Sequence, residues 1–264
     1  MKLGLVTYQI AATWDINTII EKCSAFGFEG VELRTTHKHG VEPSLSAKER
    51  AEVKSRFEDS PVKLVCLGSL CEYHSPEPAV VQENIDITKE FVLLAKDVGA
   101  QGVKVRPNAL PDGVPREKTI EQIGRALQEV ASFASDYGIK IRLEVHGKDS
   151  CYPPYIKQMI DIAGHPNLYV CWNSNDQDID ETGSIEKHFN MLKDRIEICH
   201  IHELSSKYPW ESLFFLLKKA DYKGFCLAEV SASSEPDRFM QYYRALFHAL
   251  VRLSSYVYKK QEEK

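Results

Sequence analysis

Short apolar runs alternate along the whole chain with longer stretches of helical periodicity, and no other feature of the sequence constrains the fold as strongly. The predicted strands are residues 2–8, 30–34, 62–67, 102–106, 139–145, 168–172, 196–200 and 225–230. The predicted helices are residues 16–26, 47–57, 80–98, 117–137, 155–163, 185–192, 210–220 and 237–258. Eight strands, each followed by a helix, within 264 residues predict an α/β protein with a closed (β/α)₈ barrel.

An open doubly wound sheet is the competing fold, because it is built from the same alternation. No Gly-x-Gly-x-x-Gly motif and no phosphate-binding Gly-x₄-Gly-Lys-Ser/Thr loop follows any predicted strand, so that fold lacks its usual functional support. No low-complexity linker or change in composition divides the chain. We therefore expect a single barrel domain over residues 1–258 and a short C-terminal tail at 259–264.

Charge and cysteine usage narrow the class of protein. A formal net charge of −5 argues against a nucleic-acid partner, since such binders usually carry basic patches. No apolar stretch reaches the roughly 18 residues needed to span a membrane. The seven cysteines include no Cys-x-x-Cys pair and lie mostly in apolar runs, which indicates buried, reduced thiols in a cytoplasmic protein. A cysteine nucleophile is the alternative, but no cysteine has an evident histidine partner.

Four polar residues, Glu144, Asn173, His200 and Glu229, stand at the ends of the last four predicted strands. They recur at intervals of 29, 27 and 29 residues, about the length of one strand, one helix and two loops. Side chains in corresponding places of successive βα units converge at the carboxyl end of a barrel. Two carboxylates, an imidazole and an amide there predict a divalent-metal site with acid/base capacity, although each residue alone could be structural. Such a site suits proton abstraction next to a carbonyl, as in sugar isomerisation or epimerisation.

Several short motifs occur in one order and at one spacing along the chain. They are GFEGVEL at 27–33, VGAQGV at 98–103, LEVHG at 143–147, HIHE at 200–203 and DYKGFCLAEV at 221–230. With these motifs the sequence resembles the xylose isomerase-like TIM barrels over nearly its whole length. That superfamily includes sugar-phosphate isomerases and epimerases, ketohexose 3-epimerases, inosose dehydratases and endonuclease IV.

The resemblance implies a single divalent ion, of Mn, Mg, Co or Zn, held by Glu144, Asn173, His200 and Glu229, with the two glutamates acting as a base/acid pair. The chain departs from the family pattern at Asn173, where a carboxylate is expected, and at Asp176, where a histidine is expected. An amide oxygen can coordinate a hard ion but removes one unit of negative charge. Three consequences remain open: weaker metal binding, compensation by Asp176, or loss of the family reaction.

Further residues are candidates for contacts with the substrate. The set consists of Arg34, Arg106, His146, Trp172, Glu203 and Lys207. The two arginines end predicted strands and could bind a carboxylate or phosphate group, or could form salt bridges at the rim. His146 could contact substrate oxygens or support the metal ligands, and Trp172 could stack on a sugar face.

Several functions remain open from the sequence. The first is a metal-dependent isomerase or epimerase of a sugar, sugar phosphate or polyol. The alternatives are an inosose-type dehydratase or lyase on the same scaffold, and a metal-poor, non-catalytic barrel that binds carbohydrate. An endonuclease-type phosphodiesterase would need extra zinc ligands and a basic face for DNA. The formal net charge of −5 does not favour such a face. We expect a small sugar or polyol as the binding partner, no membrane contact, and a homo-oligomer, since barrels of this superfamily often form dimers or tetramers.

Overall fold

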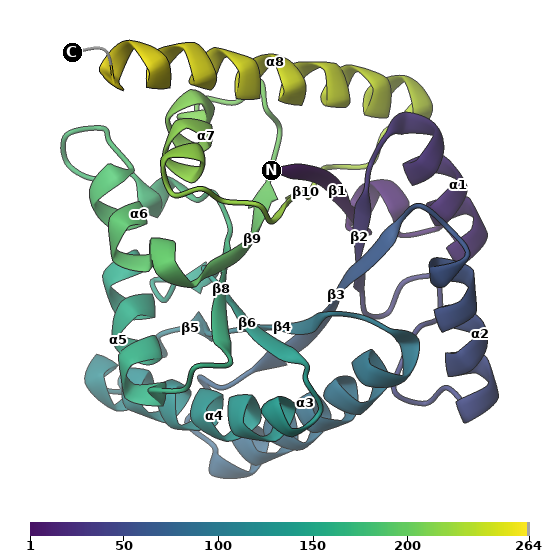
Figure 1. Cartoon of the computed structure of the whole chain (residues 1–264). Coiled ribbons are helices and arrows are strands. Elements are labelled where there is room, and N and C mark those ends of the chain that lie inside the picture. Colours follow the sequence, from purple (N-terminus) through teal and green to yellow (C-terminus); the bar gives the residue numbers. More distant parts are fainter. Residues whose placement is uncertain (263–264) are drawn as a thin grey trace.

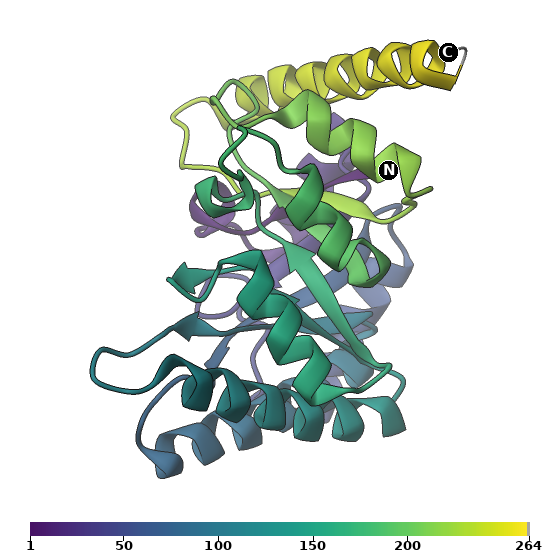
Figure 2. The same ribbon diagram turned by 90° about the vertical axis from the view of Figure 1, so that its left-hand side faces the viewer.

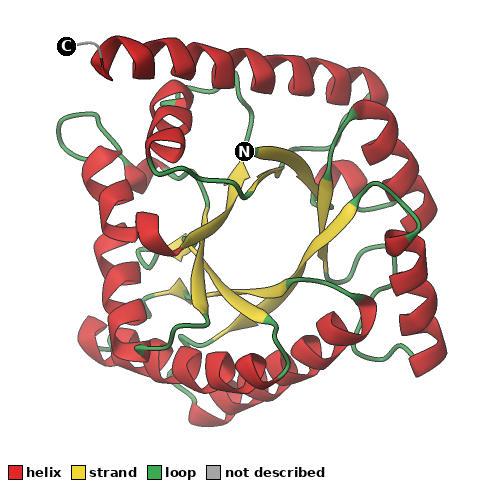
Figure 3. Cartoon of the chain, viewed as in Figure 1, coloured by secondary structure: helices red, strands yellow, loops and turns green. Residues whose placement is uncertain are grey.

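The computed structural model describes residues 1–262 and shows a closed barrel of eight parallel strands surrounded by helices (Figure 1 and Figure 3). In barrel order the strands are β1 (Lys2–Val6), β10 (Phe225–Ala228), β9 (Ile196–Ile201), β8 (Leu168–Trp172), β6 (Lys140–Glu144), β4 (Gly102–Arg106), β3 (Lys63–Glu72) and β2 (Gly30–Arg34). The sheet closes at β1, where Leu5 lies opposite both Val31 of β2 and Ala228 of β10. The predicted (β/α)₈ barrel is confirmed, and an open doubly wound sheet is excluded.

Eight helices cover the outside of the barrel in the described residues (Figure 3). They are α1 (Ile16–Phe26), α2 (Ala47–Glu58), α3 (Pro78–Val98), α4 (Arg116–Asp136), α5 (Pro153–Ala163), α6 (Glu186–Leu192), α7 (Trp210–Lys219) and α8 (Pro236–Glu262). Local sequence explains several of the ends. Asp15 accepts a hydrogen bond from the backbone of Thr18 at the start of α1, and Ser46 and Glu49 form a capping box on α2. Gly27 ends α1 in the left-handed conformation, with φ of 72°.

The last helix is longer than the sequence predicts. α8 runs to Glu262, into the stretch 259–264 for which we expect a tail, and residues 263–264 lie outside the described residues. The division into a barrel and a tail therefore stays a prediction. Among the described residues, no helix combines the length and the apolar character that crossing a bilayer requires.

Two short strands form a ribbon that the sequence does not predict. β5 (Asn108–Ala109) pairs with β7 (Gly147–Lys148) and so joins the loop after β4 to the loop after β6. In Figure 2 these blue and teal segments project together at one end of the barrel. Gly147 is required at this crossing, because its φ is 100° and a Cβ atom there would lie 2.0 Å from the Asn108 carbonyl oxygen. The ribbon fixes two loops at the rim that carries the candidate site.

The core has two parts, one inside the barrel and one between the sheet and the helices. The inner cluster consists of Val6, Val65, Cys66, Cys171, Ile198, Phe225 and Leu227. Buried polar side chains of the strands, among them Glu32, Lys104, Glu144 and His200, interrupt this apolar interior. All seven cysteines are buried and free. Burying several charged groups in a barrel is costly unless they are paired, so this polar set is a candidate for function.

Candidate metal centre

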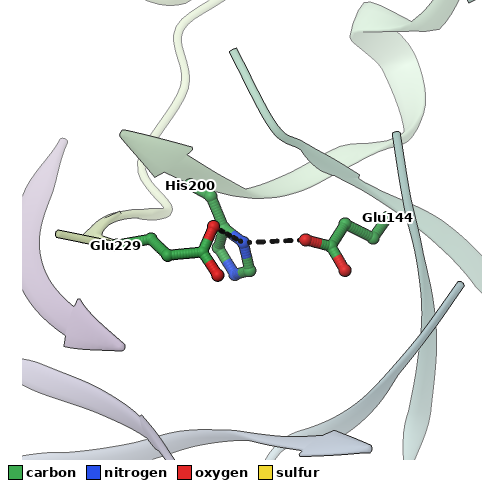
Figure 4. A group of neighbouring side chains, drawn as sticks. All are labelled: Glu144, His200 and Glu229. Atoms are coloured by element: carbon green, nitrogen blue, oxygen red, sulfur yellow. Dashed lines mark ion pairs between the residues drawn. The ribbon is translucent and has the colours of Figure 1, made fainter. Parts of the chain in front are cut away.

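Three of the four predicted ligands meet at the carboxyl end of the barrel. Glu144 is the last residue of β6, His200 lies in β9, and Glu229 directly follows β10. His200 Nδ1 lies 3.3 Å from Glu144 Oε1 and 3.4 Å from Glu229 Oε2, and Figure 4 shows the two carboxylates reaching the ring from opposite sides. One ligand atom from each residue lies within 4.8 Å of the others. This spacing suits two carboxylates and one imidazole around a single divalent ion.

Asn173 lines a cavity together with two of these ligands, Glu144 and Glu229. Its Nδ2 donates to Asn175 Oδ1 at 3.3 Å, and Asn175 in turn donates to the carbonyl of Val145. These bonds assign the nitrogen of the Asn173 amide to the side of Asn175 and leave Oδ1 as the free atom of the amide, in a residue that lines the same cavity as Glu144 and Glu229. Oδ1 is buried and has no hydrogen-bond partner among the described residues.

Two buried atoms without a hydrogen-bond partner allow a test of whether a metal fits, although one of them, His200 Nδ1, has ion-pair contacts with Glu144 and Glu229. Asn173 Oδ1 and His200 Nδ1 are both buried without a hydrogen-bond partner among the residues that the structure describes, and both are ordinary metal donors. Together with the Glu144 and Glu229 carboxylates they form a donor set that fits a divalent ion. Asp176, in contrast, is exposed in the short helix Asp176–Asp178 and does not line the cavity. Compensation for Asn173 by Asp176 is therefore not supported.

A buried carboxylate on β2 holds the other side of the His200 ring. Glu32 Oε2 lies 3.1 Å from His200 Nε2, and both side chains are completely buried. A carboxylate on the far ring nitrogen fixes the orientation of a metal-binding histidine and assigns Nδ1 as its ligand atom. Glu32 was not predicted as a site residue from the sequence. The available signal was a carboxylate in the middle of a predicted apolar strand.

Lys104 is a second buried residue that was not predicted from the sequence. It lies in the middle of β4, and its Nζ donates to Glu144 Oε2 at 2.7 Å and lies 4.0 Å from Glu32 Oε1. Burial opposes ionisation of Glu144, but the Lys104 ammonium and the His200 ring outweigh burial and lower the pKa of Glu144 to about 2. Burial likewise opposes ionisation of Glu229, and His200 and His202 nevertheless hold the pKa of Glu229 well below its ordinary value. Both glutamates are therefore anionic at neutral pH and can act as ligands or bases.

Glu144, Asn173 and Glu229 line a cavity of about 590 Å³. Four of the predicted substrate contacts line it: Arg34, Arg106, His146 and Glu203. Arg106 Nη2 lies 3.2 Å from Glu72 Oε2, whereas the Arg34 guanidinium lies over the Tyr8 ring and has no carboxylate partner among the described residues. Burial lowers the pKa of His146, so its ring is neutral at pH 7. The cavity is thus polar and carries both signs of charge.

Two predicted substrate contacts do not reach this cavity. Trp172 is completely buried, packs its ring 5.7 Å from that of Phe189, and donates from Nε1 to Tyr208 Oη at 3.0 Å. It points into the helix layer because Cys171, its neighbour in β8, faces the barrel interior. Lys207 is exposed in the loop after β9 and does not line the cavity. Neither residue is placed to contact a substrate in this cavity.

A buried hydrogen-bond network anchors the loop that carries Asn173. Tyr208 Oη donates to Asp178 Oδ2 at 2.9 Å, and the backbone N–H of Asn175 donates to the same oxygen at 2.8 Å. Asp178 Oδ1 is buried without a partner in the described part of the chain. Burial raises the pKa of Asp178 from its ordinary value of 3.8 to about 7, despite these two donors.

Asp178→Asn should stabilise the protein at alkaline pH. The folded protein holds the Asp178 proton more tightly than the unfolded chain, so the contribution of Asp178 to stability is complete below pH 3.8 and declines as pH rises to about 7. Asparagine keeps an acceptor for Tyr208 and Asn175 and carries no charge. We expect the variant to gain about 2–3 kcal/mol relative to wild type between pH 5 and pH 8, measured by urea unfolding. If the free energy of unfolding of the variant changes with pH in parallel with that of wild type, the prediction is wrong. Asp176→Asn, at an exposed position, is the matched control.

Comparisons with known proteins agree with this architecture. Residues 20–246 match the family described as xylose isomerase-like TIM barrel. An inosose isomerase from Bacillus velezensis is 23% identical over 158 residues, which cover 59% of this chain and 56% of that protein. An inosose isomerase from Halalkalibacterium halodurans is 23% identical over 246 residues, which cover 84% of this chain and 86% of that protein. The matched region thus spans just over half of the first relative and most of the second.

Solved structures share the whole fold. The D-psicose 3-epimerase from Clostridium cellulolyticum H10, crystallised with D-tagatose, has a TM-score of 0.79 at 16% identity, covering 95% of this chain and 99% of that one. The IolI protein with a bound zinc atom has a TM-score of 0.76 at 16% identity, covering 97% of this chain and 98% of that one. At these identities the similarity establishes the fold.

Proposed function

We propose that this chain, which belongs to the xylose isomerase-like TIM barrel family, is a divalent-metal-dependent isomerase or epimerase of a sugar, sugar phosphate or polyol. The related inosose isomerases and the similar epimerase structure support a sugar isomerase or epimerase type of barrel. The observation that carries the finer proposal is the cluster of Glu144, His200 and Glu229 beside a cavity that Asn173 also lines. The Asn173 amide oxygen is buried there without a hydrogen-bond partner among the described residues. The zinc atom of the similar IolI protein supports a metal at such a site.

The four ligands would hold the ion through Glu144 Oε1, Asn173 Oδ1, His200 Nδ1 and Glu229 Oε2. A divalent ion bound there would polarise a substrate carbonyl and make the neighbouring C–H and O–H groups more acidic. Zn²⁺, Co²⁺ and Mn²⁺ all accept this mixture of oxygen and imidazole donors, and Mg²⁺ prefers an oxygen-only set. A nitrogen ligand therefore favours one of the first three ions.

The two glutamates supply the proton transfer in this proposal. They come from β6 and the end of β10, which are separated in the barrel by β8 and β9, and they approach His200 from opposite sides (Figure 4). A substrate carbon between them could lose a proton to one carboxylate and, on the opposite face, receive a proton that the other carboxylate has first taken up from solvent, which inverts the configuration of that carbon. An isomerase needs only one of them, because the same carboxylate can return the proton to the neighbouring carbon. Glu229 is the better placed base, since Lys104 already holds Glu144.

The alternatives differ in what they require of the site. A dehydratase would use the same base but release water. A multinuclear endonuclease site would need further ligands, and among the described residues a single metal-type cluster is present. One histidine near the rim of the barrel, His39, cannot supply such a ligand, because its ring nitrogens bond the Arg34 carbonyl and the Val41 N–H. The structure gives no support to an endonuclease function.

Solvent-exchange measurements test the proposed function across a panel of candidate substrates. Protein loaded with Mn²⁺, Co²⁺ or Zn²⁺ is incubated in D₂O with ketoses, ketose phosphates and inososes, and each mixture is followed by NMR. We expect deuterium to enter at the carbon beside the carbonyl of at least one compound, with an isomer or epimer as product. Loss of water would identify a dehydratase. Binding of a sugar without exchange under any metal would identify a non-catalytic barrel.

A further inference from the structure

Lys104 belongs to a closed ring of four buried groups inside the barrel. Its Nζ donates to Glu144 Oε2 at 2.7 Å, and Glu144 Oε1 lies 3.3 Å from His200 Nδ1. His200 Nε2 lies 3.1 Å from Glu32 Oε2, and Glu32 Oε1 lies 4.0 Å from Lys104 Nζ. None of the four side chains is more than 4% exposed. The ring shares Glu144 and His200 with the proposed metal-ligand set.

The ring contains its own positive charge, on Lys104, of the kind that a bound metal ion would also supply. Buried carboxylates need a nearby cation, because desolvation strongly penalises an isolated charge. In the metal-free protein the Lys104 ammonium supplies this positive charge to Glu144, and it also lies 4.0 Å from Glu32 Oε1. One oxygen of Glu144 faces Lys104, and the other faces the ligand atoms. A divalent ion and the ammonium would therefore share a single carboxylate.

We infer that Lys104 is a built-in counter-ion that competes electrostatically with the metal, so that the barrel is stable when unloaded and its ion exchanges readily. This inference rests on the proposed metal centre. Lys104 adds a positive charge, and Asn173 lacks the negative charge of a carboxylate, so both residues make the site less negative. In water-excluded surroundings a unit charge this close to a divalent ion has a large effect on binding. Lys104 thus tunes metal affinity through the carboxylate of Glu144.

Lys104→Met tests the inference, because methionine keeps the length of the side chain and removes the charge. We expect the metal-free variant to melt at a lower temperature, since Glu144 loses its ion pair. We also expect it to bind Mn²⁺ and Co²⁺ at least tenfold more tightly than wild type in calorimetric titrations. The rise in melting temperature on adding saturating Mn²⁺ should accordingly be larger in the variant.

Lys140→Met is the matched control. Lys140 begins β6, and its ion pair with Glu197 lies at the opposite end of the strand that Glu144 ends, so its loss should leave metal affinity unchanged. If Lys104→Met does not fold without metal, it is purified with Mn²⁺, and transfer of the ion to a chelator should be at least tenfold slower than from wild type. Equal or weaker binding by Lys104→Met, with wild type binding normally, would overturn this inference alone. If neither protein binds Mn²⁺ or Co²⁺, the metal centre is wrong and the inference falls with it.

Discussion

Glu229→Gln should abolish exchange of the substrate proton with solvent, by a factor of about 10³ or more, while the barrel stays folded. Glutamine has nearly the same size, but it is neutral, cannot accept the proton and is a weaker ligand. General base catalysis alone contributes about 10²–10⁴ in rate, and loss of a metal ligand adds to this. Glu229 lines the cavity and also contacts His200 and His202, so the melting temperature of the variant is measured beside its exchange rate to show that it is folded.

The measurement separates the two roles of Glu229. The incorporation of deuterium into the substrate is followed in D₂O at increasing metal concentrations up to saturation. Recovery of wild-type exchange at saturating metal would show that Glu229 is a ligand only, and would contradict its role as the base. Glu235→Gln, an exposed glutamate in the loop that follows, is the matched control and should exchange at the wild-type rate. Exchange in Glu229→Gln within tenfold of wild type would overturn the proposed chemistry.

Asn173→Asp should tighten metal binding by at least tenfold, or about 1.4 kcal/mol. The substitution places a carboxylate oxygen where the unpaired amide oxygen now lies and adds one negative charge next to the ion. The same change removes the N–H that donates to Asn175 and leaves an extra charge buried in the metal-free protein. We therefore expect a lower melting temperature without metal and a larger increase on adding it.

Asn173→Ala is the companion variant and should bind the ion more weakly than wild type, because it removes the donor altogether. Both affinities are measured by titration of chelator-stripped protein with Mn²⁺ and Co²⁺. If all three proteins bind with the same affinity, Asn173 is not a ligand. The ordering Asp, Asn, Ala from tightest to weakest is the expected result.

The fold could be predicted well because each signal for it is local. Apolar runs, capping residues and glycines lie within a few residues of the element that they define, and the helix ends differ from prediction by at most two residues apart from α8. The β5–β7 ribbon was missed because two-residue strands have no periodicity to detect. β3 also extends past its predicted end, to Glu72, where pairing with Arg106 of β4 resumes after an irregularity in the register.

The site could be predicted only in part, for a physical reason. Glu144, His200 and Glu229 lie in corresponding places of the fifth, seventh and eighth βα units, so their spacing brings them together. Glu32 lies 168 residues from its partner His200, and Lys104 lies 40 residues from Glu144, so no spacing rule connects them. Both are charged residues inside otherwise apolar strands, which is the signal that could have found them.

The error at Trp172 has a different origin. Being at the end of a strand does not determine which way a side chain points, because successive residues face opposite sides of the sheet. Cys171 in β8 faces the barrel interior, Asn173 directly after β8 lines the cavity, and Trp172 between them packs among the helices. The alternation of side chains along the strand, and not proximity to the rim, decides which aromatic residue can meet a substrate.

An anomalous-difference map from a crystal grown with Mn²⁺ tests the central claim most directly. The predicted result is one strong peak within coordination distance of Glu144 Oε1, Asn173 Oδ1, His200 Nδ1 and Glu229 Oε2, and loss of that peak in Glu229→Gln crystals grown in the same way. A map from wild-type crystals without a peak among these four residues, at a Mn²⁺ concentration that saturates related metal sites, would contradict the account.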